Sequence, residues 1–190
     1  GAGAMMDVLT GRVNPSGRLA ETYPIRYEDT PAFRYFPSAE RNSEYREGLY
    51  IGYRYYDTSR VRVQYPFGFG LSYTSFSYGK LTLEEKADKI IARLSVTNTG
   101  SRTADEVVQL YVHKEKSRVK QPVMQLKSFV RLKDLAPGET AEAELIVNRE
   151  ELRYYDVISE AMLLESGDYT FMAGASSGDI RQQAVLRLEG

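Results

Sequence analysis

The chain has 190 residues, of which 42% are hydrophobic and 27% charged, and its formal net charge is −1. This composition is ordinary for a globular protein, and a near-neutral charge gives no reason to expect nucleic acid or an anionic membrane as partner. The longest apolar runs fall far short of the roughly 20 residues that span a bilayer, and the lack of cysteine excludes disulfides and thiolate metal sites.

The first 13 residues predict the end of a helix. Apolar side chains recur at helical spacing in Ala4, Met5, Val8 and Leu9, and Gly11 follows as a stop signal. No basic segment precedes an apolar one, so we expect no secretory signal in these residues. We expect a chain that opens inside a helix to be part of something longer. Residues 14–17 then predict a turn.

Three stretches with different character follow. Residues 24–46 hold three of the seven prolines and many charges, which predicts an irregular surface loop. Residues 49–56 alternate two sets of side chains that are both apolar or aromatic, which is typical of a strand covered on both faces. Residues 64–73 are rich in glycine and aromatic residues, and we expect them to form a packed connector.

From about residue 76 the pattern changes to short strands of period two. The alternating segments are residues 90–97, 108–113, 126–132, 141–147, 169–175 and 184–188. Pro137 and Gly138 suit a type II turn, and Asn148 followed by Glu151 suits the N-cap of a short helical turn. Around seven such strands predict an antiparallel β-sandwich of the immunoglobulin or fibronectin III type, so the fold class is mainly β with a partial α/β segment before it.

Ordered motifs along nearly the whole chain resemble glycoside hydrolase family 3, typified by β-glucosidases. Before residue 76 they are NPSGRL at 14–19, YREGLYIGYRYYD at 45–57 and PFGFGLSY at 66–73. After it they resemble the family's fibronectin III-like domain, with VTNTG at 96–100, DEVVQLY at 105–111, QP at 121–122, LKSF at 126–129, LAPGE at 135–139, LRYYD at 152–156, GDY at 167–169 and GASS at 174–177. The sequence departs from the family pattern at Ala20, Ser128, Ala161 and Met162.

The resemblance implies an architecture of three domains. A barrel carries the nucleophilic Asp, a second α/β domain carries the acid/base Glu, and the fibronectin III-like domain follows. Residues 1–75 resemble the end of the second domain, and residues 76–190 the third. The nucleophile motif has no counterpart here, and the acid/base Glu is expected upstream. The implied partners are therefore the missing catalytic domains of a parent enzyme, with a β-glycoside substrate bound only by the whole enzyme.

The carboxyl groups nearest to the family motif do not form a catalytic pair. Retaining glycosidases need two carboxyl groups about 5–5.5 Å apart. Glu47 and Asp57 would lie roughly 33 Å apart on one extended strand, so we expect a strand-end cap and a salt bridge instead. Arg54 is the expected partner, because a guanidinium binds a carboxylate as a fork. We assign no catalytic residue in this chain.

Other polar candidates also favour structural roles. His113 is the only histidine, and we expect it at a surface or edge position, because no nucleophile and orienting carboxylate accompany it. Asp7, Glu44 and Glu115 lack metal-ligand spacing, so we predict no metal and no cofactor. The basic residues 114–121 predict a solvated strand connection, with the mouth of a parent active site as the alternative.

The aromatic residues allow two interpretations. Tyr35, Phe36 and Tyr45 offer rings that could stack on a sugar in a substrate subsite, and functional side chains often lie on loops. Tyrosine also fills buried gaps while its hydroxyl finds a partner. For residues 50–56 we favour core packing, and for the loop residues 33–45 the two interpretations stay open.

Two functions therefore compete. The first is a structural C-terminal portion of a β-glucosidase-like enzyme that is inactive alone, and the alternative is a non-catalytic glycan- or protein-binding β-sandwich module. A lone strand at residues 49–56 would expose an apolar edge and invite self-association through the 1–75 segment. We expect that segment to fold back on the sandwich, to exchange between protomers or to pack on a missing domain. The compartment is not predicted, since cytoplasm, periplasm and secretion are all compatible.

Overall fold

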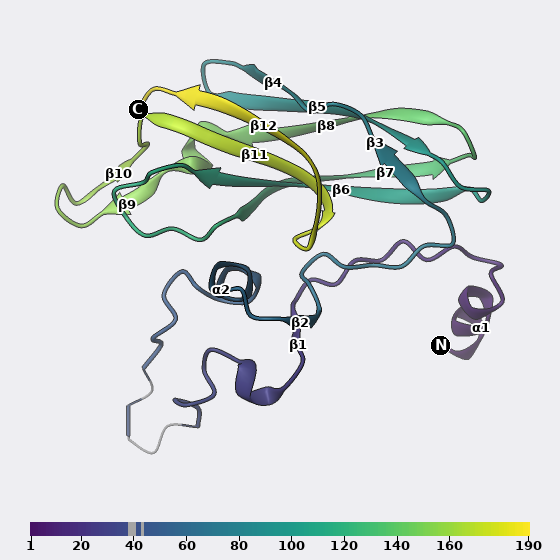
Figure 1. The fold of residues 1–190 in the computed structure, drawn as a ribbon, viewed down its shortest axis with the longest axis horizontal. Helices are drawn as coiled ribbons and strands as arrows, with labels where there is room; N and C mark the ends of the chain where they lie inside the picture. Colours follow the sequence, from purple (N-terminus) through teal and green to yellow (C-terminus); the bar gives the residue numbers. More distant parts are fainter. Residues whose placement is uncertain (38–40, 43) are drawn as a thin grey trace.

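A two-layer β-sandwich dominates the structure, a computed structural model that describes residues 1–37, 41–42 and 44–190 (Figure 1). One sheet has the antiparallel order β12-β11-β6-β7. Its strands are β6 (Ala104–Lys114), β7 (Gln125–Leu135), β11 (Gly167–Ser176) and β12 (Asp179–Leu188). In the other sheet β5 (Lys89–Asn98) is central. It pairs on one side with β3 (Phe76–Tyr78) and β4 (Thr82–Glu85), and on the other with β8 (Thr140–Asn148).

The predicted sandwich is confirmed, and so are the six alternating segments that predicted it. Each lies within one of the strands β5, β6, β7, β8, β11 and β12. The turn at residues 136–139 also forms, because Gly138 has φ +80° and the Glu139 amide donates to the Ala136 carbonyl at 2.9 Å. A short helical turn, η2 (Arg149–Leu152), follows Asn148, although the Asn148 side chain does not cap it.

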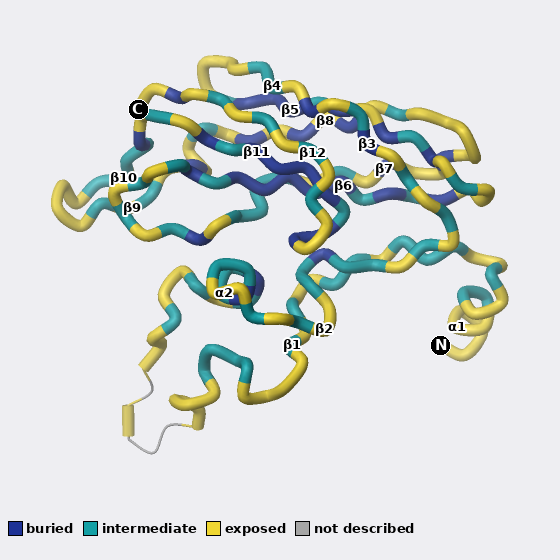
Figure 2. The backbone as a smooth tube through the Cα atoms, viewed as in Figure 1, coloured by how far each residue is buried: buried dark blue, intermediate teal, exposed yellow. Residues whose placement is uncertain are grey.

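The hydrophobic core lies between the two sheets (Figure 2). Period-two alternation puts the even-numbered side chains of β6 on its inner face, where they meet those of β5, β8 and β11. The fully enclosed members include Ile90, Val96, Val108, Leu110, Leu145, Val147 and Phe171. Burial of side chains of this kind stabilises a fold by about 1.5–3 kcal/mol each, so this sandwich supports whatever packs on its outside.

The first 75 residues form small elements below the sheet that contains β6 (Figure 1). They are α1 (Ala2–Leu9), β1 (Tyr23–Pro24), η1 (Tyr27–Asp29), α2 (Tyr53–Ser59) and β2 (Val63–Tyr65). Outside this segment, at one end of the sandwich, β9 (Tyr154–Asp156) and β10 (Ala161–Leu163) form a further hairpin. The predicted helix at the start of the chain is confirmed, and α1 buries none of its residues.

The prediction of a strand at residues 49–56 is wrong, because helix α2 occupies the second half of this stretch. Tyr53 and Tyr56 lie three residues apart, so a helix turns both toward one face, and both are buried. Gly52 begins the helix with φ +57°, and Arg60 ends it in the left-handed region. The strand edge on which self-association was predicted therefore does not exist.

Part of the 1–75 segment folds back on the outer face of the sandwich. Helix α2 lies next to the sheet that contains β6 and β11 (Figure 2), and its Tyr53 packs with Tyr111 and Met172 of these strands. Residues 17–19 and 66–70 run together beside it, since the Leu19 amide donates to the Phe69 carbonyl and the Gly68 amide to the Leu19 carbonyl, each at 2.8 Å. The described residues between Ile25 and Ile51 are largely exposed, as predicted for the loop at residues 24–46.

Asn98 fastens the connection between β3, β5 and β7. Its side chain is fully buried and its amide nitrogen donates to the carbonyls of Arg102 and Leu135, at 2.7 and 2.8 Å. Its amide oxygen accepts from the Thr74 hydroxyl at 2.7 Å and from the Gly100 amide at 3.1 Å. All four partners would lose a hydrogen bond together if this side chain were removed.

We therefore expect Asn98→Ala to lower the free energy of unfolding by about 2–4 kcal/mol, because a buried group left without a partner costs about 1–3 kcal/mol. Urea denaturation followed by circular dichroism measures it. Ser95→Ala, at an exposed position of the same strand, is the control and should change stability by less than about 0.5 kcal/mol. Equal effects of the two substitutions would contradict this role of Asn98.

Candidate functional site

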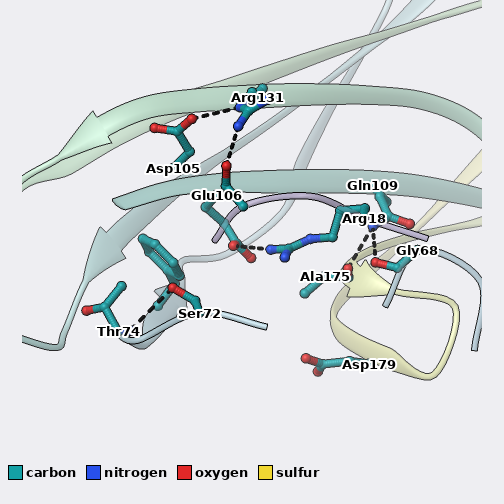
Figure 3. Close-up of polar contacts among 12 residues, drawn as sticks. Arg18, Gly68, Ser72, Thr74, Asp105, Glu106, Gln109, Arg131, Ala175 and Asp179 are labelled. Atoms are coloured by element: carbon teal, nitrogen blue, oxygen red, sulfur yellow. Dashed lines mark hydrogen bonds and ion pairs between the residues drawn. The ribbon is translucent and has the colours of Figure 1, made fainter. Parts of the chain in front are cut away.

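The polar centre of the contact between the 1–75 segment and the sandwich is Gln109 on the outer face of β6 (Figure 3). Its buried amide nitrogen donates to the Gly68 carbonyl at 3.1 Å and to the Ala175 carbonyl at 2.7 Å. Its oxygen accepts from the Tyr111 hydroxyl at 2.6 Å. A Cβ on Gly68 would lie 2.0 Å from that oxygen, so only glycine lets the backbone approach this closely.

A buried ion pair lies beside Gln109, at the beginning of β6. Arg18 Nη2 lies 2.6 Å from Glu106 Oε2, with 12% and 2% of the two side chains exposed. The other carboxylate oxygen of Glu106 accepts from the Tyr78 hydroxyl at 2.8 Å. Burial raises the pKa of Glu106, while the Arg18 charge opposes this rise. Arg18 thus supplies the countercharge that lets a carboxylate enter the end of the sandwich core.

A cavity of about 430 Å³ opens at this ion pair. Two guanidinium groups and two carboxyl groups line it, from Arg18, Arg181, Glu106 and Asp179. Both carboxyl groups are already engaged, because Arg181 Nη2 lies 2.7 Å from Asp179 Oδ2. A general acid or a nucleophile needs a carboxyl group that can reach the substrate. The cavity is therefore a charge-balanced junction, and its carboxyl groups are bound to neighbouring side chains.

An aromatic cluster forms the apolar half of the same contact. Tyr53 of α2 stacks on Phe67 with ring centroids 4.6 Å apart and meets Tyr111 of β6 edge-on at 5.9 Å. The Tyr53 hydroxyl accepts from the Leu126 amide at 2.8 Å, so its polar end is satisfied at the edge of β7. Such pairs contribute about 0.5–1.5 kcal/mol beyond their buried area. The core-packing interpretation of the tyrosines at 50–56 is confirmed for Tyr53.

Asp57 of α2 has an unsatisfied carboxylate oxygen in this contact. Its Oδ2 and the hydroxyl oxygen of Ser177 are both buried and have no hydrogen-bond partner among the described residues. Burial raises the pKa of Asp57 above its ordinary value, and the Ser177 hydroxyl partly offsets the rise although the two groups miss hydrogen-bond geometry. The prediction that Arg54 pairs with Asp57 is wrong, because the Arg54 guanidinium lies over the Tyr53 ring, 6.0 Å from the centroid.

The structure places the other predicted residues as follows. Glu47 lies in a turn of the exposed loop, and no ion pair joins it to Arg54 among the described residues. His113 is half-buried on β6, an internal strand, so of the expected surface or edge position it has the first and not the second. Its Nδ1 lies 3.2 Å from the Pro122 carbonyl. Lys114 begins the basic stretch 114–121 and is only 6% exposed, so the prediction of a solvated connection fails there.

The three aromatic candidates lie in the exposed loop. Tyr35 is 46% exposed, and the Arg46 guanidinium sits 4.5 Å from its ring centroid. Phe36 and Tyr45 are 67% and 91% exposed. No contact among the described residues joins these rings into one surface, and a sugar subsite there stays a prediction.

No three histidine, aspartate or glutamate side chains of residues 1–37, 41–42 and 44–190 group closely enough to hold a metal ion. No helix within the same residues is long and apolar enough to cross a bilayer.

The residues that define the contact lie within the family-like sequence motifs, but the motifs alone predict no structural role for them. One signal in the sequence points to Glu106, because it shares the inward register of Val108, Leu110 and Val112 on one predicted strand. A carboxylate in that register requires a cation. The sequence gives no indication that Arg18, 88 residues away, supplies it.

Two family comparisons match the two parts of the chain. The sequence model described as "Glycosyl hydrolase family 3 C-terminal domain" matches residues 1–73, and the one described as "Fibronectin type III-like domain" matches residues 106–177. Among curated proteins, "Thermostable beta-glucosidase B" of Acetivibrio thermocellus is 41% identical over 98% of this chain and 25% of its own length. "Exo-alpha-(1->6)-L-arabinopyranosidase" of Bifidobacterium breve is 36% identical over 100% of this chain and 25% of its own.

Solved structures give the same result. A Bifidobacterium adolescentis GH3 β-glucosidase superposes with a TM-score of 0.93 at 39% identity, over 99% of this chain and 28% of that one. β-Glucosidase 3B from Thermotoga neapolitana in complex with glucose gives 0.91 at 36% identity, over 98% and 26%. The chain thus spans about a quarter of the length of the relatives that it matches.

Replacing one partner of the buried ion pair should lower the free energy of unfolding more than replacing both partners. We expect Arg18→Met to lower the free energy of unfolding by about 3–5 kcal/mol, because it leaves a buried carboxylate without its countercharge. The double variant Arg18→Met/Glu106→Gln should recover at least about 1 kcal/mol of this loss. Urea denaturation of the four proteins of this cycle gives the coupling energy, and additive single effects would contradict a coupled pair.

The Asp57 carboxyl predicts a pH dependence of defined sign. Because its folded-state pKa is raised, ionisation opposes folding. This cost is absent below the ordinary pKa and complete above the folded-state pKa. The wild-type chain should therefore lose stability relative to Asp57→Asn as the pH rises through that interval. Urea midpoints of both proteins from acidic to neutral pH measure the difference, and a wild-type gain over the same interval would refute the assignment.

Proposed function

Because the chain belongs to glycoside hydrolase family 3 and corresponds to the C-terminal part of its β-glucosidases, we propose that it serves a parent enzyme as a structural element. In this proposal it completes the second, α/β domain and braces it with the fibronectin III-like sandwich. The whole enzyme would hydrolyse terminal β-D-glucosyl or related β-glycosyl bonds with retention. This chain alone would not turn over substrate.

The observation that carries the proposal is the way in which the two matched regions are joined. Arg18 comes from the region that matches the family's C-terminal domain, and Glu106 from the region that matches the fibronectin type III-like domain. Their ion pair is buried, and Gln109 and Tyr53 add hydrogen bonds and stacking beside it. An arrangement of this kind fixes the orientation of two domains, which is the role expected of a brace.

We propose a division into residues 1–75 and 76–190. Strand β3 begins at Phe76, and all strands of the two sandwich sheets follow it in the chain. Within residues 1–75, helix α1 has no buried residue and Leu71 is 68% exposed. Exposed apolar surface of this extent is typical of an interaction site, which supports the view that this portion packs against the rest of a second domain.

The chemistry of hydrolysis is proposed to belong to the rest of the parent. A retaining mechanism needs a nucleophilic carboxylate and an acid/base carboxyl group about 5–5.5 Å apart. At the cavity beside the ion pair, Glu106 is bound by Arg18 and Tyr78, and Asp179 is bound by Arg181. The relatives also differ in sugar, since one is named a β-glucosidase and another an arabinopyranosidase. Specificity for a β-glucosyl unit is therefore an expectation for the whole enzyme.

The alternative is a free-standing glycan- or protein-binding β-sandwich module. The match of residues 1–73 to a family of enzyme domains now favours the structural role.

The proposal predicts that the purified chain does not hydrolyse an aryl β-D-glucoside above the buffer rate. "Thermostable beta-glucosidase B" of Acetivibrio thermocellus serves as the positive control. The hydrolysis rate is measured as release of nitrophenol from 4-nitrophenyl β-D-glucoside, followed at about 400 nm, near the absorbance maximum of the product. Turnover by the chain that is lost on mutating one of its own carboxyl groups would overturn the proposal.

A further inference from the structure

A second cavity, of about 400 Å³, lies at the opposite end of β6 from the Arg18–Glu106 pair. Side chains from the ends of β6, β7 and β11 form its walls, together with residues around η2 and β9. Its volume falls within the range of about 300–1,000 Å³ that is usual for small-molecule sites. We call it the Lys114 pocket, after the buried lysine on its wall.

Lys114 is unusual because it is 6% exposed and has no carboxylate within ion-pair distance in the described part of the chain. Its Nζ donates to the Glu115 carbonyl at 2.7 Å and lies 5.3 Å from the Tyr169 ring centroid. An ammonium group has three donors, so two remain. Gly167 lies against this lysine, since a Cβ there would be 2.8 Å from Nζ.

The pocket has an excess of positive charge. Lys114, Lys120, Lys127 and Arg153 line it, and Glu151 is the only carboxylate among its lining residues. Glu151 already accepts from Asn148 at 3.0 Å. Cations that share a partly desolvated cleft raise the local concentration of anions.

Lys127 is the second lysine on the wall of the pocket. It lies on β7, where its Nζ donates to the Glu151 carbonyl, and burial lowers its pKa, with the nearby charge of Arg54 adding to the effect. Glu165 lies next to the pocket and partly offsets the charge of Lys114, but its carboxylate is engaged by the Ser117 hydroxyl at 2.6 Å and the Arg118 amide at 2.7 Å.

The other walls suit a sugar ring. Tyr154 and Tyr155 present aromatic surface, Tyr169 forms the buried floor at 2% exposure, and Gln121 and Gln125 bring amide groups. Aromatic faces pack against apolar ring surfaces, and a few amides suffice to bind hydroxyl groups. An inorganic anion would use the lysines alone, whereas a sugar acid would use both kinds of wall.

We propose that the Lys114 pocket binds an acidic sugar unit, with the carboxylate of a uronate between Lys114 and Lys127 and the sugar ring against the tyrosines. This places a glycan-binding site at the end of β6 opposite the Arg18–Glu106 pair, where Leu49 of the 1–75 segment also lines the pocket. The site is independent of the proposed structural role and would not require catalysis by this chain.

Titration of the ¹⁵N-labelled 190-residue chain with D-glucuronate, D-glucose and inorganic phosphate tests the proposal. Glucuronate should give saturable amide shifts around residues 114, 127 and 169, and it should bind at least about fivefold more tightly than either glucose or phosphate. Raising the salt from about 20 to about 200 mM should weaken it, because the lysines act through charge.

Lys127→Gln should weaken glucuronate binding at least about fivefold, because the substitution removes one of the two cations that face the carboxylate. Lys133→Gln, on the exposed end of the same strand, is the matched control and should bind as the wild type does. A glucuronate titration without saturation would overturn the proposal. So would equal binding of glucose or phosphate, or equal loss in both variants. Amide spectra of each variant confirm that it is folded.

Discussion

The arrangement of this protein depends on a carboxylate that enters the end of a hydrophobic core. Glu106 occupies a position on β6 where its neighbours in register are Val108 and Leu110, and only 2% of its side chain is exposed. A charge in such a place requires a counterion and hydrogen bonds. Tyr78 of the sandwich provides the hydrogen bond, and Arg18 of the other part of the chain provides the cation. The ion pair therefore ties the position of residues 17–19 to the sandwich.

The neighbouring contacts follow from this constraint. Once residues 17–19 are fixed, their backbone hydrogen bonds to residues 68 and 69 hold the loop of Phe67 and Gly68 against β6. The Phe67 ring of that loop stacks on Tyr53 and so positions α2. Helix α1 buries none of its residues, and the described residues of the loop from 25 to 51 expose apolar side chains. Residues 1–75 are thus packed on the side that faces the sandwich, whereas their other side is exposed and suits a further partner. This agrees with the chain matching about a quarter of the length of its relatives.

The sequence allowed the sandwich to be predicted but not its attachments. Strands such as β5 and β8 have one buried face, so period-two alternation identifies them directly. Helix α2 was missed because apolar side chains at nearly every position of 49–56 mimic a two-faced strand, while its helical signal is limited to the spacing of Tyr53 and Tyr56. The Arg18–Glu106 pair and the burial of Lys114 were missed for another reason. Both depend on contacts between distant segments, and local patterns contain no information on those contacts.

We expect residues 14–22 and 53–75 to form one cooperative unit with the sandwich. Native-state hydrogen exchange of the whole chain, read by mass spectrometry of peptides, tests it most directly. We predict that peptides covering α2 and residues 66–70 exchange with the same opening free energy as peptides covering β6 and β11, while α1 and residues 25–37 exchange fast. Rapid exchange throughout residues 53–75 with a fully protected sandwich would contradict the account.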